Sequence, residues 1–119
     1  MATRKLESMG DRGERKVAQM AGPKAKRTAK KAPFDVVDYA AGVAYEVKTV
    51  SQASVGRGNK IHIETAAWNR KMDFLAETGL TGKLMVVVYF NRRKVEVYRM
   101  DLVKHVRITA VLKNAERMD

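Results

Sequence analysis

The sequence predicts an α/β fold whose elements follow the order helix, strand, strand, helix, strand, strand, helix. Segments with apolar residues at helical spacing, two of them closed by a glycine, indicate helices. Runs rich in β-branched and aromatic residues, joined in pairs by short turns, indicate strands. A length of 119 residues and an apolar content of 45% suit one modest core, so we expect a single domain over residues 1–119.

The first helix is expected to begin at Asp11, because Glu14 follows three residues later in the spacing of a capping box. An apolar stripe at helical spacing comes next, made of Val17, Met20 and Ala21. Gly22 and the proline after it are expected to end the helix. Residues 1–9 before this helix are expected to form a flexible basic N-terminus, and residues 23–32 after it a lysine-rich loop.

A β-hairpin is expected next, with arms over residues 33–39 and 43–50 and a turn at residues 40–42. Such a hairpin brings Asp35 of the first arm close to Glu46 of the second. Lys48 shares a face with Glu46, because side chains alternate along a strand with a period of two.

The remaining elements are a flexible turn region over residues 51–60, a helix over 63–78, strands over 83–90 and 94–100, and a last helix. The middle helix carries one apolar face, formed by Trp68, Met72 and Leu75. Asp101 is expected to cap the last helix, whose apolar positions are Ile108, Leu112 and Ala115.

The charge of the chain favours a polyanionic partner. The formal net charge is +11, and residues 1–31 carry 10 Lys or Arg against 3 Asp or Glu. A field of this sign attracts DNA or RNA, and binding should weaken with salt as counterions are released.

The composition also excludes some classes of protein. Without cysteine there is neither a disulfide framework nor a thiolate zinc site. No apolar stretch approaches the roughly 18 residues of a membrane span, and residues 1–10 lack the apolar segment of a secretory signal. We therefore expect a cytoplasmic protein that uses neither a membrane nor a small organic cofactor.

The residues expected to meet in the hairpin suit phosphodiester hydrolysis. Asp35 and Glu46 can offer carboxylate oxygens to Mg²⁺, and Val47 a backbone carbonyl, since Mg²⁺ prefers oxygen ligands and retained waters. Lys48 would hold the attacking water or neutralise the phosphate. A bound cation and the ammonium would keep both carboxylates ionised despite their mutual repulsion.

Several of these residues also suit simpler roles. Asp38 competes with Asp35 as a ligand, although it is one residue off in strand phase. Glu46 and Lys48 also suit a solvated pair on an exposed strand. A capping box alone accounts for Glu14.

This order of motifs resembles the PD-(D/E)xK nuclease superfamily from Gly10 to about Met100. The segments that carry the resemblance are Gly10-x-x-x-Glu14-x-x-Val17, Pro33-Phe34-Asp35 and Glu46-Val47-Lys48-Thr49. The resemblance implies a restriction-endonuclease-like core, in which helices flank a mixed central sheet. It also implies that Glu14 joins Asp35 and Glu46 at the metal, so that these three and Lys48 are the catalytic residues.

Size, charge and motif order are closest to those of archaeal-type Holliday junction resolvases, which are homodimers that cut branched DNA. The expected function is therefore a Mg²⁺-dependent DNA endonuclease, with Mn²⁺ as a possible substitute, acting as a homodimer through the second or the C-terminal helix. The alternative is a non-catalytic nucleic-acid-binding module with a nuclease-like fold. The residues expected to hold phosphates are Lys24, Lys26, Arg27, Lys30, Lys31, Arg57, Lys60, Arg70 and Lys71.

Overall fold

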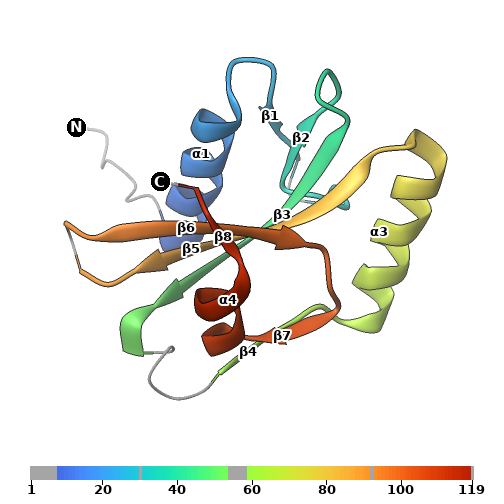
Figure 1. Ribbon diagram of the computed structural model, residues 1–119. Coiled ribbons are helices and arrows are strands. Elements are labelled where there is room, and N and C mark those ends of the chain that lie inside the picture. Colours follow the sequence, from blue (N-terminus) through green and yellow to red (C-terminus); the bar gives the residue numbers. More distant parts are fainter. Residues whose placement is uncertain (1–7, 30, 54–58, 92, 119) are drawn as a thin grey trace, which may run out of the picture.

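A six-stranded sheet in the order β1-β2-β3-β5-β6-β8 forms the centre of the computed structural model (Figure 1). The structure describes residues 8–29, 31–53, 59–91 and 93–118. Its strands are β1 (Lys26–Arg27), β2 (Val36–Asp38), β3 (Val43–Ser51), β5 (Thr81–Tyr89), β6 (Val95–Asp101) and β8 (Glu116–Arg117). A separate two-stranded sheet pairs β4 (Lys60–His62) with β7 (His105–Arg107). The helices within these residues are α1 (Met9–Ala21), α3 (Thr65–Thr78) and α4 (Ile108–Asn114).

The central sheet is mixed, which is the arrangement that the resemblance implied. Its long strands β3 and β5 run parallel, with Val47 opposite Met85, and all its other neighbours are antiparallel. A parallel pair needs a crossover connection, and α3 lies in the segment that connects β3 to β5. The result is a compact α/β globule with helices on both faces of the sheet (Figure 1).

Alternation along the strands divides the core between the two faces. Val17 of α1 packs with the inward side chains of one face, Tyr45, Val47, Met85, Val87 and Val97. The other face presents Leu84, Val86 and Val88 of β5 to α4 and to Ile61 of β4. A smaller cluster of Phe34, Val37 and Ala44 packs against Phe74 and Leu75 of α3. Glu46 and Lys48 share their face with Ala44, on the side of the sheet opposite α1.

Helix α1 begins earlier than the sequence predicted. Ser8 is the N-cap, and its hydroxyl accepts from the backbone N–H of Asp11 at 3.1 Å. The Ser8 hydroxyl also donates to Asp11 Oδ2 at 2.9 Å, and the N-cap lies one turn before the expected one. The predicted start at Asp11 was wrong, and Glu14 has no capping role. Residues 8 and 9 belong to the helix and its cap, whereas 1–7 lie outside the described residues.

Helix α1 lies close to β3 at a glycine. A Cβ added to Gly13 would collide with the hydroxyl of Thr49, so no larger side chain fits there without movement. Thr49 Oγ1 is buried and has no hydrogen-bond partner among the described residues. The close approach brings Glu14, the next residue, toward the sheet.

Three further sequence-based expectations need correction. The expected loop over 23–32 contains β1, which adds to the free edge of β2. Asp101 ends β6, and α4 begins only at Ile108, with Arg107 at its N-cap. The short strands β4, β7 and β8 were not predicted, because two- and three-residue strands leave little pattern in a sequence.

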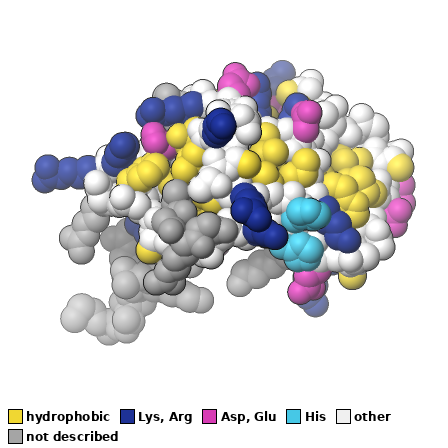
Figure 2. Space-filling view, turned by 60° about the horizontal axis from the view of Figure 1, so that its bottom comes forward, with side chains coloured by type: hydrophobic (Ala, Val, Ile, Leu, Met, Phe, Trp, Pro, Cys, Tyr) yellow, Lys and Arg dark blue, Asp and Glu magenta, His cyan; other side chains and the backbone are white. Residues whose placement is uncertain are grey.

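Pairing of β4 with β7 places the two histidines of the chain side by side. His62 lies opposite His105, with ring centroids 6.3 Å apart, and both are exposed. Figure 2 shows the two rings next to each other, with Lys or Arg side chains on either side. Within the described part of the chain, no helix has the length and apolar character needed to cross a membrane.

Candidate active site

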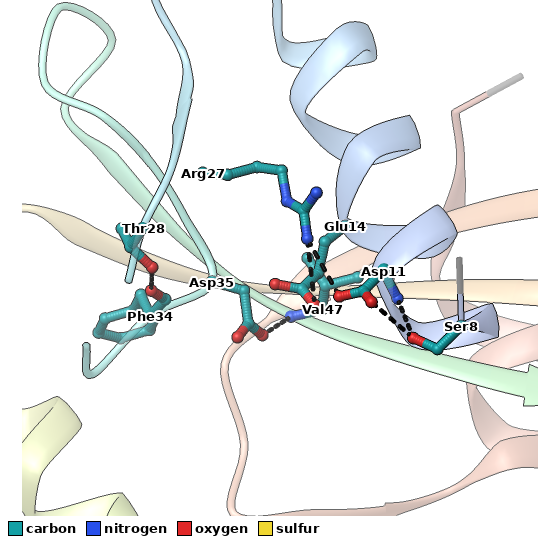
Figure 3. Close-up of polar contacts among 8 residues, drawn as sticks. All are labelled: Ser8, Asp11, Glu14, Arg27, Thr28, Phe34, Asp35 and Val47. Carbon is teal, nitrogen blue, oxygen red and sulfur yellow. Dashed lines mark hydrogen bonds and ion pairs between the residues drawn. The ribbon is translucent and has the colours of Figure 1, made fainter. Parts of the chain in front are cut away.

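Asp35 lies where β2 stops pairing with β3. Its backbone N–H donates to the carbonyl of Tyr45 at 3.0 Å. Its Oδ2 accepts from the backbone N–H of Val47 at 2.9 Å, so the carboxylate takes the place of the next ladder partner (Figure 3). The N–H and C=O of a strand residue leave on the same side, so the Val47 carbonyl also leaves β3 on the side of Asp35.

The environment of Asp35 disfavours its charged form. Burial, and next the nearby carboxylate of Glu46, raise the pKa of Asp35 to about 6, although the hydrogen bond from Val47 opposes the shift. Glu14 raises this pKa further, and the ammonium of Lys71 lowers it. The structure therefore brings Asp35 into the electrostatic range of both other predicted acids.

Glu46 is buried in the middle of β3, with 6% of its surface exposed. Its Oε1 lies 3.5 Å from the ammonium of Lys48, the next residue on the same face. Its Oε2 contacts the ammonium of Lys71 from α3. Both carboxylate oxygens thus face a cation of the protein itself.

Lys71 was expected on the DNA-facing surface, but the structure places it inside the protein. It is the one buried residue of α3, which is otherwise half-buried or exposed. Its ammonium contacts Glu46 and donates to the carbonyl of Pro33, and it lies 4.8 Å from the centre of the Phe34 ring. Lys71 therefore ties α3 to β3 and to the segment before Asp35. Helical spacing puts position 71 on the same face as Trp68 and Leu75, and this position could have predicted that Lys71 is buried.

Glu14 approaches from α1, on the opposite face of the sheet from Glu46. Figure 3 shows Arg27 of β1 reaching over Asp11 and Glu14. Its Nη2 lies 3.3 Å from Asp11 Oδ1 and 3.9 Å from Glu14 Oε2. Burial raises the pKa of Glu14, the guanidinium of Arg27 lowers it, and the carboxylates of Asp11 and Glu46 raise it. Arg27, expected to grip phosphate, is thus engaged with the acids of the site.

The three predicted ligands do not form a closed three-carboxylate site. Among the described residues, no group of three or more acidic or histidine side chains is arranged to hold a metal ion. The reason is local: Glu46 turns to Lys71 and Lys48, and Glu14 comes from the other face. Asp38, the alternative ligand, is buried at the end of β2 and accepts from the backbone N–H of Ala41 at 3.0 Å.

The other predicted phosphate contacts lie mainly on the surface. The exposed ones are Lys24, Lys26, Lys31, Lys60 and Arg70. Arg70 donates to the backbone carbonyl of Lys31 at 2.5 Å, which connects α3 to the segment before Pro33. Lys30 and Arg57 lie outside the described residues.

No protein-family model matches this chain, and no curated protein matches it either. The chemistry of the site therefore follows from its own geometry.

Proposed function

We propose that this protein is a Mg²⁺-dependent DNA endonuclease of the PD-(D/E)xK type. The observation that carries the proposal is the hydrogen bond from the Val47 N–H to the Asp35 carboxylate. It joins an acid from the hairpin's first arm to the centre of the strand segment Glu46-Val47-Lys48. Strand β3 and the entry to β2 hold these residues rigidly, as the positioning of reacting groups requires.

Each side chain has a defined task in this proposal. Asp35 and Glu46, with the Val47 carbonyl, would hold the metal. Glu14 would approach the metal from α1, on the opposite face of the sheet from Glu46. Lys48, whose side chain is 37% exposed, would orient the attacking water or the phosphate. Lys71 is buried, so its task is to position Glu46.

The residues present fit Mg²⁺ in the way this ion is usually held. Mg²⁺ takes one or two carboxylates and leaves other positions to waters and substrate phosphates, so a third protein carboxylate is not required. Burial, and next the carboxylate of Glu46, raise the pKa of Asp35, and a bound cation would favour its charged form against both effects. When bound, the ion would lower the pKa of a water and stabilise charge on the phosphoryl oxygens.

The leading subtype is a branched-DNA resolvase that acts as a homodimer, because two strands need two cuts and one chain carries one such site. Light scattering with and without DNA tests this point. A monomeric mass in both conditions would remove the dimer from the proposal without affecting the chemistry.

The decisive experiment is a cleavage panel of four-way junction, fork, linear duplex and single strand, each with Mg²⁺ and with EDTA. Glu46→Gln and Lys48→Ala should abolish cutting and leave DNA binding measurable. Glutamine is preferred to alanine at position 46 because it keeps an oxygen beside Lys71, which limits damage to the fold. Undiminished cleavage by both purified variants would falsify the proposal.

A binding module without catalysis is the second candidate, and one observation favours it. Both oxygens of Glu46 already face ammonium groups, so the site is partly neutralised without a metal. Such a module would bind DNA in a salt-sensitive manner and nick none of the four substrates at any Mg²⁺ or Mn²⁺ concentration.

A further inference from the structure

An apolar cavity of about 210 Å³ opens beside the candidate active site. Its walls come from β1, from the segment that leads into β2, and from α3. The lining residues used in the argument are Lys26, Thr28, Ala32, Phe34, Tyr39 and Phe74. Lys26 was expected to hold a phosphate, and the others have no role in the proposed chemistry.

One aromatic side chain connects this cavity to the active site. Phe34 lines the cavity, directly precedes Asp35, and lies 4.8 Å from the ammonium of Lys71. The Thr28 hydroxyl donates to the Phe34 carbonyl and fixes this segment, with Asp35 on the side toward Val47 (Figure 3). A ligand in the cavity would thus lie next to the residues proposed to act on a phosphate.

The lining selects for a flat apolar group. The rings of Phe34 and Phe74 lie 5.7 Å apart and tilted. Tyr39 is 68% exposed, more than any other large hydrophobic residue among those described. An exposed aromatic at the mouth of an apolar cavity is suited to stack on a planar ring.

The volume of the cavity and the charge of the protein restrict the class of ligand further. A volume of about 210 Å³ is below the roughly 300–1,000 Å³ of pockets that enclose a whole small ligand, so the cavity suits one part of a larger molecule. The larger molecule should be anionic, since exposed Lys26 lies on the cavity wall and the chain carries a net charge of +11. A nucleobase attached to a phosphate backbone meets both conditions, whereas an apolar peptide meets only the first.

We propose that this cavity takes an unstacked nucleobase of the bound nucleic acid, stacked against Tyr39. The proposal rests on the proposed function for its substrate class and adds a selection for unpaired bases. A base held in a duplex cannot enter, so strands near a branch or in single-stranded form would be preferred.

The test is a binding assay in EDTA, where cleavage plays no part. The probes are a fluorescent single-stranded oligonucleotide and an abasic oligonucleotide of the same length, which keeps the phosphates and lacks the bases. The wild-type protein should bind the first roughly 5- to 150-fold more tightly, the range expected for one stacked base. Tyr39→Ala, and Ala32→Trp, which fills the cavity, should each reduce this ratio toward one and leave abasic binding unchanged.

Tyr39→Phe is the matched control and should keep the ratio, because the ring remains. Tyr89→Ala removes an aromatic from a different cavity and should also keep it. Equal binding of the two probes by the wild type, or an unchanged ratio in both Tyr39→Ala and Ala32→Trp, would overturn the proposal. Thermal melts verify that the variants fold.

The same variants in the Mg²⁺ cleavage panel test the nuclease proposal separately. If the protein selects for bases but cuts none of the substrates, the nuclease proposal is wrong and the proposed role of the cavity stands.

Discussion

The ammonium of Lys71 contacts Oε2 of Glu46, and each side chain is only 8% exposed. This ion pair joins α3 to the centre of β3. Two buried charges are costly to desolvate, and the cost is recovered only while both partners are present. The pair therefore makes the fold of α3 and the charge balance of the candidate site depend on each other.

Lys71→Met is expected to lower the free energy of unfolding by about 3 kcal/mol, because it leaves a buried carboxylate with one partner fewer. Glu46→Gln in the same background should recover part of the loss, since it removes the unpaired charge. Urea unfolding of both single variants and the double variant measures this coupling. Additive effects would mean that the two side chains do not interact in solution.

Divalent cations should compete with Lys71 for Glu46. Mg²⁺ at millimolar concentration is expected to raise the melting temperature of the wild type, by the linkage between binding and folding, and EDTA should reverse the rise. The rise should be larger in Lys71→Met and smaller in Glu46→Gln. The same shift in all three proteins would place the bound ion elsewhere on the molecule.

Lys48 and Lys71 should separate chemistry from stability. The Lys48 side chain is 37% exposed and lies 3.5 Å from Glu46 Oε1, so its removal costs the fold little. Lys48→Met is expected to change the free energy of unfolding by less than about 1 kcal/mol and to lower the cleavage rate at least 100-fold. The comparison is made at a temperature where both proteins are fully folded. A large loss of stability would instead assign Lys48 a structural task.

The sequence predicted the elements with a strong pattern. The hairpin arms, the helix over 63–78 and the strands over 83–90 and 94–100 correspond to β2, β3, α3, β5 and β6. Each has either a run of β-branched residues or a clear helical period, and Gly79 closes α3 in the left-handed conformation. The start of α1 was missed because Ser8 and Asp11 form a cap as good as the expected one.

The arrangement of the site was harder to predict from the sequence. Strand alternation alone places Glu46 and Lys48 on one face, as expected. The roles of Lys71 and Arg27 depend on where α3 and β1 dock, and a basic residue in the sequence gives the same signal whether it meets DNA or a buried carboxylate. The pairing of His62 with His105 likewise depends on a contact between two three-residue strands 43 positions apart in the chain.

The raised pKa of Asp35 makes stability depend on pH. Its ordinary value of 3.8 rises to about 6 in the folded protein, so the folded state binds this proton more tightly than the unfolded state. The stabilising contribution of the protonated group is therefore complete below about pH 4 and is lost as the pH rises through about 6.

Asp35→Asn stays neutral and keeps an oxygen for the Val47 N–H. Its free energy of unfolding should exceed that of the wild type by about 3 kcal/mol at pH 7.5, and the difference should nearly vanish below about pH 4. Urea unfolding across this range measures it. A difference that is constant with pH would show that titration of this carboxyl is not its cause.

The contact between Gly13 and Thr49 yields the last prediction. In an isolated helix Gly→Ala stabilises by about 1 kcal/mol, but here the new Cβ would strike the Thr49 hydroxyl. Gly13→Ala is therefore expected to destabilise the protein by about 1–3 kcal/mol, the usual cost of overpacking. Thr49→Ala alone should cost little, because its buried hydroxyl has no hydrogen-bond partner among the described residues. The double variant removes the collision and retains the helical gain, so it should be at least as stable as Thr49→Ala. If Gly13→Ala by itself proved stabilising, α1 would lie further from β3 than the structure places it, and Glu14 would be withdrawn from the site with it.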